Sequence, residues 1–297
     1  MGKFKIGTHN GTFHSDEVFA SAIILGIFEE AEILRSRKPE LLESCDIVFD
    51  VGGGKYDHHI VGKQYRENKV PYASAGLIWR DFGKQYLSQN AKDLNEDETN
   101  KVLQSVDDSL FVTIDALDNG EDIFTSELKI KTISAVISDF NSSWNESTLS
   151  DEKFNDAVSL AKIVLKNQVN RVVSQIKAKT IIVDAFKNRE QPELLILTTF
   201  CPWQEHLISM DKNHEVLFAI YKDVNNGYRI QVVPKKLGEF AAIKDLPKEW
   251  AGKSDEEIVK ATGVEDAIFC HPGRFIAGCA SYSGIMRMAQ MAIEAKV

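Results

Sequence analysis

Residues 3–19 read KFKIGTHNGTFHSDEVF, and this stretch decides the fold of the N-terminal part of the chain. Its first six residues alternate and then break at a polar turn that contains glycine, which predicts a short buried strand. Two acids, Asp16 and Glu17, then precede apolar residues at helical spacing, so a helix with acids in its first turn should follow. The turn between the two elements carries His9 and His14.

The same alternation of strand and helix continues along the chain. Glu32–Arg35 and Ile47–Val51 are strand-like, and Pro39 can start a short helix between them. Strands and helices that alternate over such short distances predict a parallel α/β sheet. Ligands of such sheets collect beyond the carboxyl ends of the strands, which is where His9 and Asp50 lie.

The rest of the chain is predicted to be helical first and β-rich later. Helices are expected at Ala75–Leu87, Glu96–Leu117, Lys131–Phe140, Asp151–Ala185 and about Ser283–Ala295, and strands at Leu194–Thr199, Val216–Tyr221 and Tyr228–Val233. Asn226-Gly227 between the last two strands is a hairpin signal. A boundary around residues 188–192 gives an N-terminal parallel-sheet domain, 1–190, and a smaller α+β domain, 191–297. The expected fold class is α/β, with the active site in the cleft between the domains.

Composition and charge narrow the class of protein. A length of 297 residues suits two domains with a core each, and no run is long enough to span a membrane. The first residues do not resemble a signal or transit peptide, and the four scattered cysteines indicate neither a disulfide framework nor a zinc finger, so a cytoplasmic location is expected. The net charge of −9 argues against binding duplex nucleic acid through the overall field. A nucleic-acid substrate would instead bind in a local basic groove, or it would be short enough to be held mainly by metal.

Histidines and aspartates gather near the predicted strand ends. Four of the seven histidines lie within the first 60 residues, and the run Asp57-His58-His59 follows soon after Asp50. Imidazole and carboxylate are ligands for divalent metals, and this set could hold two ions about 3.5–4 Å apart, as a phosphoryl centre requires. Successive side chains of an extended segment alternate, so one of the two adjacent histidines can bind metal while the other faces substrate.

Each of these residues also has an ordinary explanation. His9 and His14 could be turn residues, and Asp16 could be an acid favoured by the helix dipole. Asp50 could simply form the turn that its neighbouring glycines indicate. The Asp57–His59 run so soon after Asp50 makes a metal site the better interpretation of the whole set.

Two further acids, Asp115 and Asp118, lie at the end of the helix that is predicted to start at Glu96. The helix dipole disfavours negative charge at that end. A bound metal therefore explains the two acids better than helix stability does.

Together these residues resemble the four-motif pattern of the DHH-type phosphoesterase superfamily. The motifs are His9…His14-x-Asp16, Asp50, Asp57-His58-His59 and an acid near 115–118. The chain is more closely similar to the melanocyte-proliferating-gene exonuclease family, over nearly its whole length. The segments that carry this similarity are residues 8–17, 46–53, 74–76, 114–120, 201–203 and 246–250.

The resemblance implies a two-ion centre, commonly with manganese, although magnesium or cobalt would also suit it. It implies that His9, His14 and Asp16 form the first motif, that Asp50 bridges both ions, and that His58 is a ligand.

The resemblance also implies roles for the remaining motif residues. The run Asp57–His59 would be the catalytic segment, with His59 in contact with the substrate phosphate. Asp118 aligns better with the fourth-motif ligand, and Asp115 remains an alternative. His14 departs from the superfamily, which usually has Asp there. The exchange removes one negative charge and should change metal preference or weaken one site.

A Gly-rich segment before the last helix loosely resembles the substrate-binding segment of the superfamily. Backbone amides around Gly273 could hold an anion, and Arg274 could pair with a phosphate or carboxylate. Arg229, on a predicted strand, is a further basic candidate. The alternative is that Gly273 and Gly278 only permit tight backbone packing.

The function that these observations predict is a metal-dependent phosphodiesterase that uses a water activated by two metals. The resemblance implies 3′-to-5′ exonuclease activity on RNA or short oligonucleotides. One alternative is a phosphatase for a small nucleotide or pyrophosphate, which the acidic charge favours slightly. Another is a metal-binding module without catalysis. No membrane partner is expected, and an oligomer is compatible with the sequence.

Overall fold

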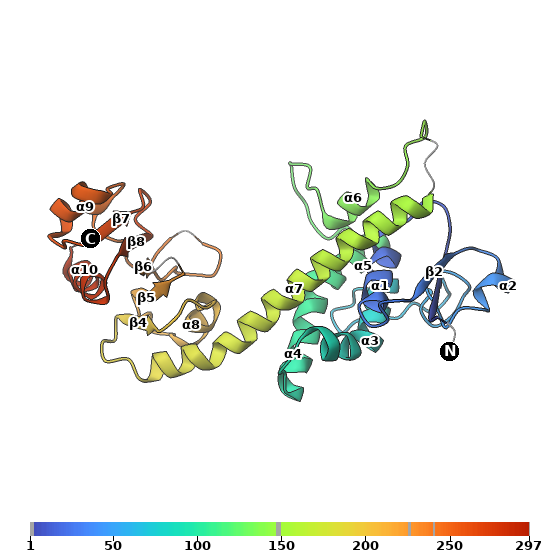
Figure 1. Cartoon of the computed structure of the whole chain (residues 1–297), viewed down its shortest axis with the longest axis horizontal. Helices are drawn as coiled ribbons and strands as arrows, with labels where there is room; N and C mark the ends of the chain where they lie inside the picture. Colours follow the sequence, from blue (N-terminus) through green and yellow to red (C-terminus); the bar gives the residue numbers. More distant parts are fainter. Residues whose placement is uncertain (1–2, 147–149, 225–226, 240, 297) are drawn as a thin grey trace. The chain divides into compact units, whose positions relative to one another are not determined.

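The computed structural model describes residues 3–146, 150–224, 227–239 and 241–296, and Figure 1 shows its helices and strands. The chain divides into two compact units, Met1–Val173 and Ser174–Val297. Each unit is described by itself. The domain boundary at 190/191 and the cleft between domains remain predictions.

The first unit contains the predicted parallel sheet. Its strands are β1 (Lys5–Thr8), β2 (Glu32–Arg35) and β3 (Ile47–Val48), in the order β2-β1-β3. Both neighbours pair with β1 in parallel, so β1 is the central strand. The third strand is shorter than predicted because the chain turns at Asp50, which has a φ of 59° and donates its amide to the carbonyl of Tyr56.

Helices make up most of the first unit. They are α1 (Ser15–Leu25), α2 (Pro39–Leu42), α3 (Ser74–Asn90), α4 (Glu96–Val106), α5 (Val112–Asp118), α6 (Ile133–Ser138) and the start of α7 (Ser150–Lys187). The helix α1 packs against α3 and α5, and Figure 1 shows these helices grouped beside β2. Where the sequence predicted one helix from Glu96 to Leu117, a π-helical segment, Asp107–Phe111, separates α4 from α5.

The start of α1 combines a cap with buried acids. The His14 amide donates to both carboxylate oxygens of Glu17, at 3.0 and 2.9 Å, which is one half of a capping box. Behind this cap, Val18, Phe19 and Ile23 are fully buried. The hydrophobic side of α1 thus fixes the helix, and its first turn holds Glu17 at the edge of the sheet.

The second unit is built around a mixed sheet. Its strands are β4 (Leu194–Leu197), β5 (Phe218–Asp223), β6 (Gly227–Val232), β7 (Ala267–Cys270) and β8 (Ile276–Cys279), in the order β4-β5-β6-β8-β7. Only β4 and β5 pair in parallel among these described strands. The helices are α8 (Gln204–Met210), α9 (Asp255–Thr262) and α10 (Tyr282–Glu294). The strands β4, β5 and β6 and the helix α10 confirm the sequence prediction, whereas α8, α9, β7 and β8 were missed.

The predicted hairpin between β5 and β6 is confirmed in its pairing, which is antiparallel from Phe218 opposite Val232 to Asp223 opposite Gly227. Asn226 itself lies outside the described residues. Across the described ranges, no helix has both the length and the apolar character that crossing a bilayer requires.

Candidate metal centre

The carboxyl edge of the parallel sheet brings together side chains from separate parts of the chain. His9 directly follows β1, and Asp50 follows β3, the strand beside it. The Nε2 atom of His9 lies 3.1 Å from Oδ2 of Asp50. The φ of Asp50 is positive, a left-handed conformation that aspartate adopts more readily than most other residues.

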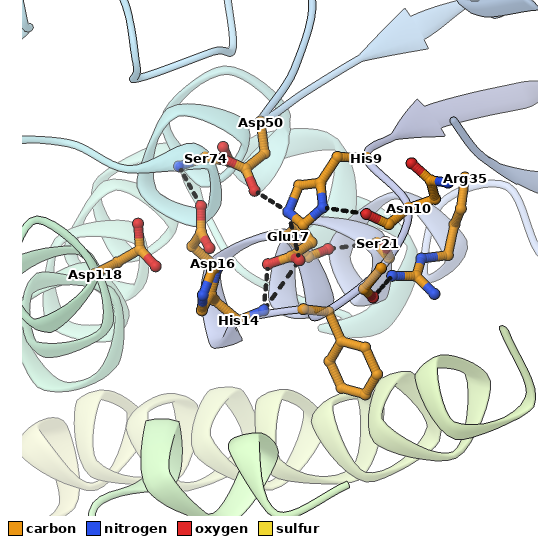
Figure 2. A network of polar contacts seen from close by, with 12 residues as sticks. His9, Asn10, His14, Asp16, Glu17, Ser21, Arg35, Asp50, Ser74 and Asp118 are labelled. Carbon is orange, nitrogen blue, oxygen red and sulfur yellow. Dashed lines mark hydrogen bonds and ion pairs between the residues drawn. The ribbon is translucent and has the colours of Figure 1, made fainter. Parts of the chain in front are cut away.

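The first turn of α1 adds two acids to this edge. Asp16 and Glu17 are both fully buried. Oε1 of Glu17 lies 3.0 Å from Nε2 of His9, and Oδ2 of Asp16 accepts the Ser74 amide at 3.2 Å. Figure 2 shows the carboxylates of Glu17 and Asp50 at the same end of the His9 ring and Asn10 at the other, with Asp118 beyond Asp16.

His58 connects the sheet edge to the end of α5. Its Nε2 atom lies 3.2 Å from Oδ1 of Asp50 and 3.2 Å from Oδ2 of Asp118. Oδ2 of Asp16 is 4.0 Å from the same nitrogen. His58 is buried, as are Asp50 and Asp16. Residues from four separate segments therefore face one small volume.

Several of these buried atoms have no hydrogen-bond partner. They are Oδ1 of Asp16, both carboxylate oxygens of Asp50 and both ring nitrogens of His58. Buried polar groups are nearly always hydrogen-bonded, and buried charges are costly without compensation. Ligand atoms that surround a cation lie close to one another without hydrogen bonds between them, because their lone pairs point at the ion. The donor set of imidazoles and carboxylates suits Mn²⁺ or a similar divalent ion.

The described residues contain more than one group of side chains that could hold a metal ion. Among the described residues, four groups of ligand atoms each lie within 4.8 Å of one another: His9 with His14 and Glu17; Asp50 with His58 and His59; His14 with Asp16 and Asp118; Asp16 with Glu17 and Asp50. His14, Asp16, Glu17 and Asp50 each occur in two groups. Shared ligands of this kind are what a two-ion centre uses.

The carboxylates would repel one another strongly without compensating charge. Burial raises the pKa of Asp118, and the neighbouring charge of Asp16 raises it further, to about 9. Burial lowers the pKa of His9, but its contacts with Asp50 and Glu17 outweigh burial and raise it to about 10. Protons thus compensate the negative charge wherever no cation does.

Asp57 and His59 lie at the rim of this cluster. Asp57 is buried, and its carboxylate accepts the amides of Gly53 at 2.8 Å and His59 at 2.9 Å. Nδ1 of His59 lies 3.2 Å from Oδ1 of Asp57 and 3.3 Å from Oδ1 of Asp50. The His59 side chain is 65% exposed, so its Nε2 can reach a ligand. Asp57 is therefore placed to orient His59.

Asp115 and Asp118 are in different environments, although both belong to α5. Oδ2 of Asp115 accepts from Arg66 at 2.7 Å, and its Oδ1 accepts the Gly76 amide at 3.1 Å. A Cβ atom at Gly76 would lie 1.9 Å from Oδ2 of Asp115, so only glycine fits there. Asp115 is in none of the four ligand groups of the described residues. Asp118 thus lies beside His58, whereas Asp115 is engaged with Arg66, and the choice between them as the fourth-motif ligand remains a prediction.

The basic candidates of the second unit already have carboxylate partners. Arg229 lies 2.7 Å from Asp223, and Arg274 lies 2.7 Å from Asp245. The Gly273 amide donates to Nδ1 of His271 at 3.0 Å. A substrate anion would have to compete with these contacts, and substrate binding by Arg229, Gly273 and Arg274 remains a prediction.

The sequence pattern of one protein family, described as MYG1_exonuc, uncharacterised protein family UPF0160, matches residues 5–293. The chain belongs to this family. The MYG1 protein of Dictyostelium discoideum is 30% identical over 97% of this chain and 96% of its own length. The protein named MYG1 exonuclease in Homo sapiens is 31% identical over 98% of this chain and 86% of its own length.

Among solved structures, this UPF0160 chain is similar to RecJ in complex with Mn²⁺ from Thermus thermophilus. The TM-score is 0.29 at 12% identity, and the alignment covers 99% of this chain but 53% of RecJ. A likeness of that size carries no argument about the site.

Two side chains of this UPF0160 member belong to the site but were not predicted. Glu17 was explained as a helix-start acid, yet its carboxylate contacts both the His14 amide and His9. Arg37 follows β2, and its guanidinium contacts Nδ1 of His9 at 3.2 Å. Its place just past a strand of a parallel sheet was the available signal, because the carboxyl ends of all three strands meet at one edge.

Proposed function

We propose that the chain is a metal-dependent phosphodiesterase whose centre holds two divalent ions, most simply Mn²⁺. The observation that carries the proposal is the set of buried ligand atoms of Asp16, Asp50 and His58 that have no hydrogen-bond partner. Buried charges are destabilising without compensation, and a bound cation would compensate them in place of the protons that do so in the metal-free protein.

The proposed ligands are His9, His14, Asp16, Glu17, Asp50, His58 and Asp118, with Asp50 between the two positions. Asp50 fits the bridging role because one of its oxygens faces His9 and the other faces His58. When bound, two ions would activate a water molecule and neutralise charge on the phosphoryl oxygens. His59, oriented by Asp57, would contact the substrate phosphate through its exposed ring nitrogen.

The proposed substrate is RNA or a short oligonucleotide, shortened from its 3′ end. Support for a nuclease comes from the relatives named exonuclease, such as the human protein that is 31% identical. The 3′-to-5′ direction comes from the family resemblance. The net charge of −9 suits a substrate that is held over a short length at the metal centre.

The test is hydrolysis of a short RNA labelled at its 5′ end by chelator-treated protein, with and without added Mn²⁺, Mg²⁺ or Co²⁺. We expect a ladder of stepwise shorter labelled products only with added ion. The Asp50→Asn and His58→Ala variants should lose at least about 100-fold of this activity, since even outer-shell changes at metal sites cost about 10–100-fold. Asp156→Asn makes the same chemical change at an exposed position of α7 and should have no effect.

The proposal fails if no ion supports turnover while His58→Ala binds metal as well as the wild type does. Immediate release of the labelled end nucleotide would reverse the polarity.

A small-nucleotide or pyrophosphate phosphatase is the second candidate. A hollow of about 540 Å³ beside the metal centre favours it, because this volume suits a ligand of nucleotide size. Affinity that stays flat as oligonucleotides grow beyond one or two nucleotides would support this alternative.

A further inference from the structure

The hollow beside the metal centre has one strongly basic side chain in its wall. His9, Asp50, Asp57 and His59 line one part of it, and Arg37 lines another. Arg37 is exposed, and it is the only arginine or lysine among the described residues that line this hollow. A phosphate that entered the hollow would therefore meet a guanidinium as well as the metal centre.

Arg37 differs from Arg35 and Arg66 in that its contacts within the described residues are to Asn10 and His9 and to no carboxylate. Its guanidinium donates to the backbone carbonyl and side-chain oxygen of Asn10 and contacts Nδ1 of His9. Within the described part of the chain, no carboxylate is close enough to Arg37 to form an ion pair. Arg35, two residues earlier, pairs with Asp151 at 2.9 Å, and Arg66 pairs with two aspartates. The charge of Arg37 is available to an anion without the loss of an ion pair.

The position of Arg37 indicates which phosphate it can reach. It contacts Nδ1 of His9, whereas Nε2 of the same ring lies 3.0 Å from Glu17 and 3.1 Å from Asp50. An ion bound at Nε2 would be separated from the guanidinium by the imidazole. A phosphate held by the ions and a phosphate held by Arg37 are therefore different groups.

We propose that Arg37 binds the phosphate next to the scissile one, so that the site selects substrates with at least two consecutive phosphates. This inference rests on the proposed phosphodiesterase function and names its substrate class: a strand or a 5′-phosphorylated dinucleotide. The planar guanidinium can donate two parallel hydrogen bonds to phosphate oxygens, and such charge-assisted bonds are stronger than those to Asn10.

The test compares two dinucleotides that differ only in a 5′ phosphate, pApA and ApA. Both carry one scissile phosphate, and only pApA carries a neighbouring one. We expect the wild type to prefer pApA by about 10- to 100-fold, the range for hydrogen bonds to charged groups. The preference should appear in KM and also in the affinity for non-hydrolysable analogues of the two dinucleotides, measured by calorimetry with Mn²⁺ present.

The Arg37→Gln variant should lose this preference, because the binding of pApA should weaken about 10- to 100-fold more than the binding of ApA. Arg37→Lys keeps the charge without the planar fork and should keep part of the preference. The matched control is Arg171→Gln, an exposed arginine of α7 whose guanidinium contacts the neutral Gln168 side chain. That variant should behave as the wild type.

An unchanged preference in Arg37→Gln, or a wild type without any preference, overturns the role of Arg37 and leaves the phosphodiesterase proposal standing. Equal loss of affinity for both dinucleotides would also overturn it, because the damage would then lie at the scissile phosphate. Failure of the wild type to bind or cleave either dinucleotide counts instead against the proposed function itself.

Discussion

Oδ1 of Asp50 lies 3.2 Å from Nε2 of His58, and both atoms are buried without a hydrogen-bond partner. Once His58 has given up its extra proton, its imidazole and the Asp50 carboxylate present two lone-pair donors to the same point. Asp50 reaches that point from a left-handed backbone conformation, with a φ of 59°. Aspartate adopts this conformation more readily than most residues, and the turn there directs the carboxylate toward His58.

The first prediction concerns stabilisation by metal. Mn²⁺ at a hundredfold excess over its Kd should raise the free energy of unfolding of the wild type by about 2.7 kcal/mol, because the ion binds only the folded state. Asp50→Asn should lose most of this gain, since the proposed bridging ligand is removed. Thermal unfolding with and without Mn²⁺ measures it, with Asp156→Asn as the control. An equal stabilisation by Mn²⁺ in Asp50→Asn and Asp156→Asn would exclude Asp50 as a ligand.

The second prediction concerns proton release. Burial lowers the pKa of His58, but Asp50, Asp16 and Asp118 outweigh burial and raise it to about 9, and similar contacts raise that of His9 to about 10. Both imidazoles are therefore in their positively charged form at neutral pH in the metal-free protein. A binding ion must displace one proton from each ring. Metal affinity should rise with pH up to about 9–10.

Calorimetry in buffers of different ionisation enthalpy counts the released protons. The same shifts mean that the metal-free fold should lose stability as the pH rises from 6.5 toward 10, because the folded state then binds more protons than the unfolded one. Metal binding without proton release would show that these imidazoles are not ligands.

The core of this site could be predicted from the sequence because it follows from topology. Parallel strands end at one edge, so His9 after β1 and Asp50 after β3 had to be neighbours once the strands were recognised. The roles of Asp115 and Asp118 could not be separated in this way. They lie three residues apart on one helix. What distinguishes them is Arg66, which is distant in sequence and binds Asp115 but not Asp118.

Several short elements were not predicted from the sequence, and in each case the reason is local. The helix α9 does carry a start signal, since Ser254 is followed three residues later by Glu257, but it is only eight residues long. The strands β7 and β8 have four residues each, too few for their periodicity to stand out. The π-helical turn at Asp107–Phe111 adds a residue to one turn without changing the apolar pattern enough to be recognised.

The third prediction concerns His14, which departs from the DHH-type motif that the sequence resembles. The exposed imidazole belongs to two of the ligand groups, with His9 and Glu17 and with Asp16 and Asp118. His14→Asp adds a hard oxygen ligand and a negative charge, so the affinity for Mg²⁺ relative to Mn²⁺ should rise by about tenfold. Metal titrations followed by calorimetry measure the ratio.

The control for that exchange is His214→Asp, in the second unit. His214 is exposed and has a φ of 54°, which aspartate tolerates. The His214→Asp variant should bind Mg²⁺ and Mn²⁺ with the same affinities as the wild type. A Mg²⁺ to Mn²⁺ ratio that is the same in His14→Asp as in the wild type would place His14 outside the ligand set.

The fourth prediction concerns the buried ion cluster that supports α5. Arg66 donates to both oxygens of Asp107 at 2.7 Å and to Oδ2 of Asp115 at 2.7 Å. Arg66→Met would leave the two carboxylates without their cation, and breaking a buried pair in this way costs about 3–5 kcal/mol. Denaturant unfolding of the chelator-treated protein measures the loss apart from any effect of metal.

Arg80→Met is the matched control, because Arg80 pairs with Asp81 at a site where the arginine side chain is 34% exposed. Such a surface pair contributes about 0–1 kcal/mol, so this variant should remain close to the wild type. Adding Asp115→Asn to Arg66→Met should recover part of the loss, since it removes the most deeply buried uncompensated charge. Equal, small losses for Arg66→Met and Arg80→Met would mean that water reaches the cluster and that Arg66 does not hold α5 in place.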